Sequence, residues 1–342
     1  MDSTDGRCAG DCPVRTLFGL LPLESIRTSM TSSLKKILKK SALAMPVVGP
    51  HFESYLRSRS DPNAPGEYYS PIPDLEDVKA REAEIWQREN SAEIPGIDLN
   101  ENAQLQLLDR LAQYHLDQPF SEHQTHARRY YFANDFYSFS DGIFYYCMLR
   151  HLKPKRVIEI GSGFSSCVLL DTNELFFDSK IRCTFIDPNP ERLFGLLRPV
   201  DNIEVVPKRL QETGLGCFDE LSAGDILFVD SSHVSKTGSD VNMILFDILP
   251  RLPAGVHVHI HDIFYPFEYP REYVYNRWAW NELYLLRAFL INNHEFRITI
   301  FPSFLERFHG ERLQSALPLA WKHPLKWPTL RGASLWIERV KG

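Results

Sequence analysis

Short apolar runs and helical stretches alternate along the second half of the chain. Each run is rich in β-branched and aromatic residues and is too short for an ordinary helix, which favours a strand. Because strands alternate with helices, the pattern predicts an α/β fold with a mostly parallel sheet and right-handed crossovers. The expected strands cover residues 156–160, 182–186, 203–206, 225–229, 256–260, 295–302 and 334–340. The expected helices between them cover residues 165–173, 191–197, 241–252 and 280–292.

The last two expected strands are joined differently. A segment rich in proline and tryptophan, residues 305–330, separates them in place of a regular helix. This connection favours an antiparallel C-terminal strand inserted at the sheet edge.

The first half of the chain divides by composition. The N-terminal segment is basic and is followed by a polar, proline-rich turn. Further along the chain, helices are expected over residues 77–90 and 99–114. A helix over residues 138–152, with Ser138 or Ser140 as its N-cap, precedes the first strand. The expected domains are a leader, partly disordered or a peripheral helix, over residues 1–67, a helical cap over 68–137 and an α/β domain over 138–342.

The first strand ends in a glycine turn. Gly161, Ser162 and Gly163 follow the apolar run and precede a helix, an arrangement that brings backbone N–H groups and a helix N-terminus up to a ligand. Glu159 would repel a dinucleotide pyrophosphate, and Ser166 replaces the third glycine of the dinucleotide motif. A ligand with a cationic amino-acid end suits Glu159 better. S-adenosylmethionine (SAM) is such a ligand.

Acidic residues lie at the carboxyl ends of four strands of the expected sheet. A single acid in this place is most often a turn former or a helix cap, but in a parallel sheet all four would lie at the edge where ligands bind. We expect Glu159 to hold the cationic end of SAM and Asp187 to accept hydrogen bonds from the ribose hydroxyls. The four acids are Glu159, Asp187, Asp230 and Asp262.

Composition narrows the class of protein. The chain has 342 residues, enough to bury a full core, and its net charge of −6 does not favour a nucleic-acid partner. Six scattered cysteines, most beside apolar runs, indicate free thiols in a reducing compartment, and we expect a cytoplasmic protein. No apolar run is long enough to span a membrane. Residues 33–48 are expected to form a surface helix or a poorly ordered leader, with weak peripheral membrane contact as an alternative.

The order of these motifs resembles the class I SAM-dependent methyltransferases. The similarity starts near Tyr68 and is greatest to a bacterial-type group with a Trp-x-Glu-x-Tyr-Leu-Leu helix, which here begins at Trp280. The resemblance implies a Rossmann-like, doubly wound sheet with an antiparallel C-terminal strand, behind a helical N-terminal extension. It also implies that SAM binds through the glycine turn and strand-end acids. The motifs are Glu-Ile-Gly-Ser-Gly (159–163), Phe-Ile-Asp (185–187), Phe-Val-Asp-Ser-Ser-His (228–233) and His-Ile-His-Asp-Ile-Phe (259–264).

Asp230 and His233, which follow the fourth strand, are candidates for catalysis. Some sugar O-methyltransferases that this arrangement resembles place a general-base histidine beside a carboxylate-bound divalent metal, which implies that role for His233, next to Asp230. An imidazole titrates near neutrality and can take a hydroxyl proton. The alternative is a loop histidine that only bonds a neighbouring carbonyl group. Asp230 is also expected to lie near the cofactor. Together with Asp262 it forms the candidate Mg²⁺ site. Ile263, however, stands at the position where catechol-type enzymes carry a further metal ligand.

Three further features bear on the site. His257, His259 and His261 alternate along the fifth strand, and only His261, at its end, is expected to reach the site. Glu282 is expected either to support the site or to lie on an ordinary helix surface. Aromatic residues over 264–275 are expected to form an acceptor wall or part of the core.

The function expected is methyl transfer from SAM, with oxygen of a small-molecule or sugar-like acceptor favoured over nitrogen. The alternative is a non-catalytic SAM-fold protein that acts as a binding or scaffold module. A nicotinamide-dependent oxidoreductase would need an apolar residue at position 159 and a glycine at position 166, and the chain has neither.

Overall fold

The computed structural model describes residues 39–42, 44–45, 62–323 and 331–341. The chain separates into two compact units, Met1–Asp74 and Leu75–Gly342. In the first unit, residues 39–42 are helical and residues 62–74 form turns. The rest of the basic segment expected over residues 33–48, apart from 44 and 45, lies outside the described residues, as does most of the leader.

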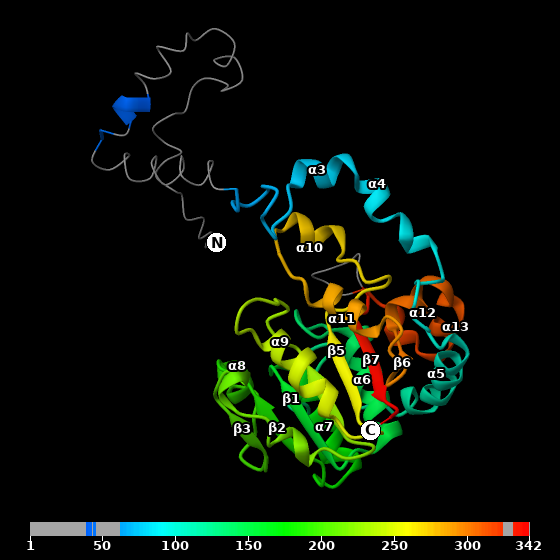
Figure 1. The fold of residues 1–342 in the computed structure, drawn as a ribbon. Helices are drawn as coiled ribbons and strands as arrows, with labels where there is room; N and C mark the ends of the chain where they lie inside the picture. The colour runs from blue at the N-terminus through cyan, green and yellow to red at the C-terminus, as the bar shows by residue number, and fades with distance from the viewer. Residues whose placement is uncertain (1–38, 43, 46–61, 324–330, 342) are drawn as a thin grey trace, which may run out of the picture. The chain divides into compact units, whose positions relative to one another are not determined.

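In the second unit, helices precede the sheet (Figure 1). The single helix expected over residues 77–90 is wrong: it is broken at Arg81 and Trp86 into three short pieces. The next two helices agree with expectation to within two residues. Ser138 stands at the N-cap position, but its hydroxyl donates to the carbonyl oxygen of Phe132 instead of capping the helix. The elements are α3 (Leu75–Ala80), α4 (Glu82–Ile85), η1 (Gln87–Asn90), α5 (Glu101–His115) and α6 (Phe139–Leu152).

Seven strands form one sheet in the order β3-β2-β1-β4-β5-β7-β6. Strands β1 to β5 are parallel to one another, as predicted. The strands are β1 (Arg156–Ile160), β2 (Arg182–Ile186), β3 (Glu204–Val206), β4 (Ile226–Val229), β5 (His257–His261), β6 (Phe296–Ile300) and β7 (Ser334–Arg339).

The C-terminal strand is antiparallel, as predicted, but it is not the outermost strand. β7 pairs antiparallel with β5 on one side and with β6 on the other, so β6 forms the edge. All of β7 except Glu338 is buried, including Trp336. An apolar strand of this kind is more stable between two partners than at an exposed edge.

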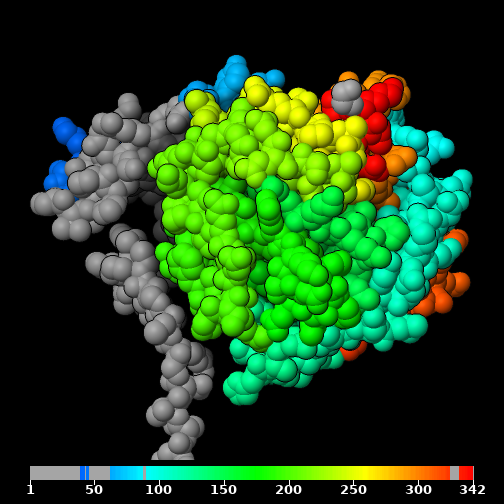
Figure 2. All heavy atoms as spheres, turned by 90° about the horizontal axis from the view of Figure 1, so that it is seen from below, coloured from blue at the N-terminus to red at the C-terminus, as the bar shows by residue number. Residues whose placement is uncertain are grey.

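Helices cover both faces of the sheet. The helix α6 packs against both α5 and α7 (Phe164–Phe176). The helices α9 (Asp240–Met243) and α11 (Glu282–Leu290) both contact the π-helix Ile244–Ile248. Figure 1 shows this second group on the side of β5 away from α6, and Figure 2 shows the segments from β1 to β3 (green) as a continuous surface. The strand order reverses between β1 and β4, where ligands bind in doubly wound sheets.

Several helical segments were not predicted. The segment 305–330 was expected to be irregular, yet its described part is largely helical. The helix expected over residues 241–252 is continuous in the chain but changes from α to π to 3₁₀ hydrogen bonding. The remaining elements are α8 (Glu191–Phe194), η2 (Leu210–Glu212), η3 (Phe218–Glu220), η5 (Leu249–Arg251), α10 (Arg271–Tyr275), α12 (Pro302–Phe308), α13 (Gly310–Ala316) and η6 (Pro318–Trp321).

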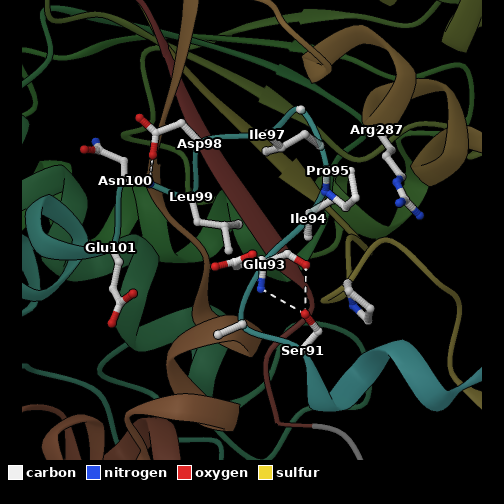
Figure 3. Close-up of a pocket in the computed structure, with 13 residues that line it drawn as sticks. Ser91, Glu93, Ile94, Pro95, Ile97, Asp98, Leu99, Asn100, Glu101 and Arg287 are labelled. Carbon is white, nitrogen blue, oxygen red and sulfur yellow. Dashed lines mark hydrogen bonds between the residues drawn. The ribbon is translucent and has the colours of Figure 1, made fainter.

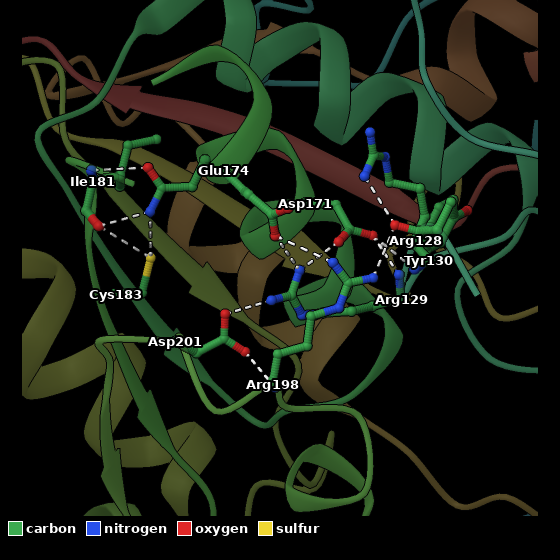
Figure 4. A network of polar contacts seen from close by, with 11 residues as sticks. Arg128, Arg129, Tyr130, Asp171, Glu174, Ile181, Cys183, Arg198 and Asp201 are labelled. Carbon is green, nitrogen blue, oxygen red and sulfur yellow. Dashed lines mark hydrogen bonds and ion pairs between the residues drawn. The ribbon is translucent and has the colours of Figure 1, made fainter. Parts of the chain in front are cut away.

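An internal ionic cluster anchors the loop before α6 (Figure 4). The Arg129 guanidinium contacts Asp171 at 2.6 Å and Glu174 at 3.0 Å, and it also bonds Asp201. The other oxygen of Asp171 accepts the backbone N–H groups of Arg129 and Tyr130, at 2.7 and 2.9 Å. Because the Arg129 and Asp171 side chains are buried, each depends on the other for charge compensation. The cluster holds the loop that leads into the candidate site against α7.

No helix among the described residues has the length and apolar character needed to cross a membrane.

Candidate active site

The glycine turn after β1 lies against the end of β4. Gly161 has a φ of +84°, and its N–H donates to the carbonyl oxygen of Ile186 at 2.9 Å. A Cβ atom here would meet the carbonyl oxygen of Asp230 at 2.1 Å, so only glycine fits without a backbone shift. The N–H of Asp230 donates to the carbonyl oxygen of Ile160 at 2.8 Å. These contacts join the ends of β1 and β4 at the point where the strand order reverses.

Glu159, in β1, is fully buried. Its Oε1 atom accepts hydrogen bonds from the hydroxyls of Ser165 at 2.6 Å and Ser166 at 2.9 Å. Its Oε2 atom is buried and has no hydrogen-bond partner among the described residues. Burial raises the pKa of Glu159 to about 8. A cationic group beside Oε2 would satisfy this oxygen and favour the ionised carboxylate.

Ser166 takes the place of the third glycine of a dinucleotide motif. Its hydroxyl accepts the N–H of Gly163 at 3.0 Å while it donates to Glu159. The side chain therefore satisfies one of the free N–H groups at the start of α7 and fixes the orientation of the Glu159 carboxylate.

Asp187 directly follows β2 and is partly exposed. Its Oδ2 atom accepts the Ser162 hydroxyl at 2.6 Å, and its Oδ1 atom accepts the N–H of Asn189 at 2.8 Å. A carboxylate has about four acceptor positions. The unused ones are open to a ligand with neighbouring hydroxyl groups.

A second group of titratable side chains gathers where β4 and β5 end. Nε2 of His233 lies 3.3 Å from Oδ1 of Asp230 and 3.5 Å from Oδ2 of Asp262. One donor atom from each of these residues lies within 4.8 Å of the others, which is compact enough for a metal ion. His233 and Asp262 have φ angles of +58° and +56°, an uncommon conformation that His and Asp tolerate.

Glu282, the first residue of α11, fixes the ring of His233. Its Oε2 atom lies 2.9 Å from Nδ1 of His233, and the glutamate is only 2% exposed. The N–H groups of Asn281 and Glu282 donate to the carbonyl oxygen of His233, and the Trp280 ring lies 4.3 Å from the imidazole. With Nδ1 engaged, Nε2 is the nitrogen that faces the carboxylates of Asp230 and Asp262.

His261, at the end of β5, is held in a similar way. Its Nδ1 atom lies 3.6 Å from Oδ1 of Asp230 and 3.5 Å from Oδ2 of Asp262. Its Nε2 atom lies 3.6 Å from Oδ2 of Asp141, in the first turn of α6. His259 is instead fully buried in the core, stacked on Phe228, where burial lowers its pKa.

The charges of these groups are coupled. Burial alone would lower the pKa of His233, but hydrogen bonds to Asp230 and Glu282 raise it to about 10. Burial also lowers the pKa of His261. The nearby carboxylates of Asp262 and Asp230 outweigh this effect and raise that pKa above its usual value. In this arrangement the pKa of His233 lies above neutral pH, which favours its protonated form.

These residues line a cavity of about 370 Å³. Its acidic members are Asp135, Asp141, Asp230 and Asp262, and its aromatic wall consists of Phe136, Tyr273, Trp278 and Trp280. Arg192 lines the same cavity and reaches toward the glycine turn: its guanidinium lies over the Phe136 ring at 3.8 Å, and its Cδ atom would lie 3.3 Å from a Cβ at Gly163. The cavity and the glycine turn are therefore neighbours.

For most of the aromatic residues over 264–275 the structure agrees with the core alternative. Of the aromatic residues over 264–275, only Tyr273 lines this cavity, and Phe264, Tyr265, Phe267 and Tyr269 are buried core residues. Trp278 and Asp141 were not predicted. A signal for Asp141 was present, because a helix that runs antiparallel to β1 must begin at the edge where the parallel strands end.

A separate cavity of about 900 Å³ lies along the loop of residues 91–101, with Arg287 of α11 on its wall (Figure 3). None of the strand-end acids or histidines lines it. We therefore take the smaller cavity as the candidate active site.

Comparisons with known proteins found one family match and several similar proteins. Residues 158–263 match a family model described as a methyltransferase domain. An uncharacterized protein of Archaeoglobus fulgidus is 33% identical over 180 residues, which cover 51% of this chain and 81% of that protein. The plantazolicin methyltransferase BamL in complex with SAH has a TM-score of 0.38 and 18% identity, over 71% of this chain and 100% of that chain. The O-methyltransferase TomG from Streptomyces achromogenes, in complex with SAM, has a TM-score of 0.36 and 15% identity, over 69% of this chain and 90% of that chain.

Proposed function

We propose that this chain, which belongs to the class I SAM-dependent methyltransferases, transfers the methyl group of SAM to a hydroxyl oxygen of a small, sugar-like acceptor in the 370 Å³ cavity. Asp230 carries the proposal, because it belongs to both halves of the site. Its backbone closes the glycine turn, and its carboxylate lies in the cavity beside His233.

The residues around the glycine turn suit SAM. The buried Oε2 atom of Glu159 lacks a partner, and the cationic end of SAM would supply one, directly or through water. Gly161 leaves the backbone bare where a ligand approaches. Ser162 and Gly163 complete the turn, and Asp187 has acceptor positions left for the two ribose hydroxyls.

The cavity suits a hydroxylated acceptor. Flat rings such as those of Trp278 and Trp280 pack against the apolar face of a sugar ring, and carboxylates accept hydrogen bonds from its hydroxyls. In this proposal the acceptor hydroxyl lies next to Nε2 of His233.

SAM supplies a methyl group bound to a sulfonium, which is already a good leaving group. The task of the protein is then to bring the acceptor oxygen into line with that methyl group and to exclude water. His233 takes the hydroxyl proton on Nε2 as the oxygen–methyl bond forms and the sulfur–methyl bond breaks. Glu282 holds the other nitrogen and stabilises the imidazolium that results.

His233 can act as a base only when it is neutral. The carboxylates around it raise its pKa to about 10, so their charge must first be compensated. Asp230 and Asp262 would hold a divalent cation, whose donor set is already compact. A bound cation supplies a Lewis acid that makes a hydroxyl more acidic. With the cation in place, His233 loses its proton more readily, because it no longer faces two uncompensated carboxylates.

Two experiments test this proposal. Calorimetric titration with SAM should give one binding site per chain, whereas an absence of binding would remove the function. Incubation with labelled SAM and a library of hydroxylated small molecules should transfer label to oxygen. A chain that binds SAM but labels no acceptor, in the library or in cell extract, would favour the alternative of a binding or scaffold module.

A further inference from the structure

We infer that the cavity holds a first-row transition-metal ion rather than Mg²⁺, with His261 as a ligand beside Asp230 and Asp262. This inference deepens the proposed function and relies on it for the role of the ion in methyl transfer, but not for binding of the ion. It assigns to His261 a role distinct from that of His233.

The separations between Nδ1 of His261 and the two carboxylate oxygens fit one ion. Nδ1 of His261 lies 3.6 Å from Asp230 Oδ1 and 3.5 Å from Asp262 Oδ2. An ion at about 2.0–2.2 Å from each donor places neighbouring donors about 3.0–3.6 Å apart. The two carboxylate oxygens are the same atoms that face His233, so all these groups converge on one small volume.

His261 has carboxylate oxygens near both ring nitrogens, but neither nitrogen forms a hydrogen bond with a described residue. Its side chain is only 7% exposed. A buried ring nitrogen without a hydrogen bond requires an explanation, and coordination of a metal ion together with the two aspartates supplies one. His233 differs, because Glu282 already engages its Nδ1 atom at 2.9 Å.

The surroundings orient these donors as metal ligands are usually oriented. Asp141 lies behind His261, on the nitrogen that faces away from the two aspartates, and its Oδ1 atom is fixed by the N–H of Ala333 at 3.0 Å. The Tyr273 hydroxyl donates to Oδ1 of Asp262 at 3.0 Å, which leaves Oδ2 for the ion. A carboxylate behind a ligating histidine fixes its ring and strengthens it as a donor.

An imidazole ligand favours a transition metal. Mg²⁺ prefers oxygen donors and keeps most of its water, whereas imidazole with carboxylates suits ions such as Mn²⁺, Fe²⁺ and Zn²⁺. Three protein ligands would leave positions open for water or for the acceptor hydroxyl. Nε2 of His233 lies 3.3 Å from Asp230, in the same range as Nδ1 of His261. We assign it to the base and not to the ion, because the proposed mechanism needs Nε2 free to take the hydroxyl proton.

Equilibrium titration of the EDTA-treated full chain with Mn²⁺, followed by the electron paramagnetic resonance signal of free Mn²⁺, tests the inference. We expect one Mn²⁺ per chain, with an affinity at least about a hundredfold above that for Mg²⁺ in competition. Equal or tighter Mg²⁺ binding, or no Mn²⁺ binding, would overturn it.

Three variants separate the histidines. His261→Gln should weaken Mn²⁺ binding about 10- to 100-fold, whereas His233→Gln should change it less than about threefold. His257→Gln, at the other end of β5, is the matched control and should bind as the wild type does. Equal losses in His233→Gln and His261→Gln, or no loss in His261→Gln, would contradict the ligand set. Circular dichroism melting checks that each variant is folded.

SAM titration of the same variants keeps the two proposals apart. If the wild type binds Mn²⁺ but not SAM, the proposed function fails and the metal site stands. If all variants bind SAM and Mn²⁺ alike, the metal inference fails and the cofactor site stands.

Discussion

Nδ1 of His233 lies 2.9 Å from a carboxylate oxygen of Glu282, although the two residues are 49 positions apart in the chain. The contact joins the loop after β4 to the first residue of α11. Both side chains are buried, so the pair is shielded from solvent competition. Several expected outcomes depend on such pairs.

Replacement of His233 should separate binding from chemistry. In the proposed mechanism, His233→Ala removes the base, and turnover should fall roughly a hundredfold or more while SAM affinity is unchanged. Glu282→Gln should lower turnover less, because the imidazole keeps a partner but loses its stabilising charge. Steady-state kinetics with calorimetry measures both quantities. Full activity in His233→Ala would remove the base from the mechanism.

Asp187→Ala should weaken SAM binding by roughly 1–3 kcal/mol, because the ribose hydroxyls lose their acceptor. Asn189→Ala is the matched control, since Asn189 contacts Asp187 through its backbone N–H, which alanine retains. Calorimetry should show a normal affinity for the control. An unchanged affinity in Asp187→Ala would contradict the assignment of the ribose site.

SAM binding should release a proton from Glu159. With a pKa of about 8 this carboxyl is mostly protonated at pH 7, and a ligand cation beside Oε2 lowers that pKa. SAM affinity should therefore rise as the pH increases from about 6 to about 7.5. Calorimetry in phosphate and in Tris should give different binding heats, and Glu159→Gln should abolish the part of the difference due to this carboxyl. If the wild type and Glu159→Gln show the same difference in binding heat between the two buffers, SAM binding is not coupled to proton release from Glu159.

The Arg129 cluster should dominate local stability. Asp171→Ala removes the most buried partner of the guanidinium and the acceptor of two backbone N–H groups, so the unfolding free energy should fall by about 3–5 kcal/mol. Glu174→Ala, at a side chain that is 37% exposed, should cost less than about 1 kcal/mol. Urea denaturation measures both. An equal loss of unfolding free energy in the two variants would show that the buried ion pair contributes no more to stability than the partly exposed one.

Residues before about Tyr68 should be dispensable for cofactor binding. Among the described residues, those that form the glycine turn or line the cavity all lie after Tyr68 in the chain. A chain that starts at Asn63 should bind SAM with the affinity of the full chain. A soluble, folded truncation that no longer binds SAM would show that the leader contributes to the site.

Much of the fold could be predicted from local patterns. The apolar run Arg156–Ile160 and the turn at Gly161 identify the first strand and the loop that follows it, and both agree with the structure. Breaks within helices were harder to predict. The split at Arg81 and the π-helix Ile244–Ile248 depend on packing more than on the periodicity of apolar residues. The position of β7 between β5 and β6 depended on pairing across the whole sheet.

The sequence by itself determined which strands end in acids and that these ends share one edge, because parallel strands align their carboxyl ends. It therefore identified Glu159, Asp187, Asp230 and Asp262 as one set. Only the tertiary structure decided which side chains meet them. Glu282 behind His233 and Asp141 behind His261 come from helices distant in the chain, and such contacts follow from how the helices pack on the sheet, which no local pattern encodes.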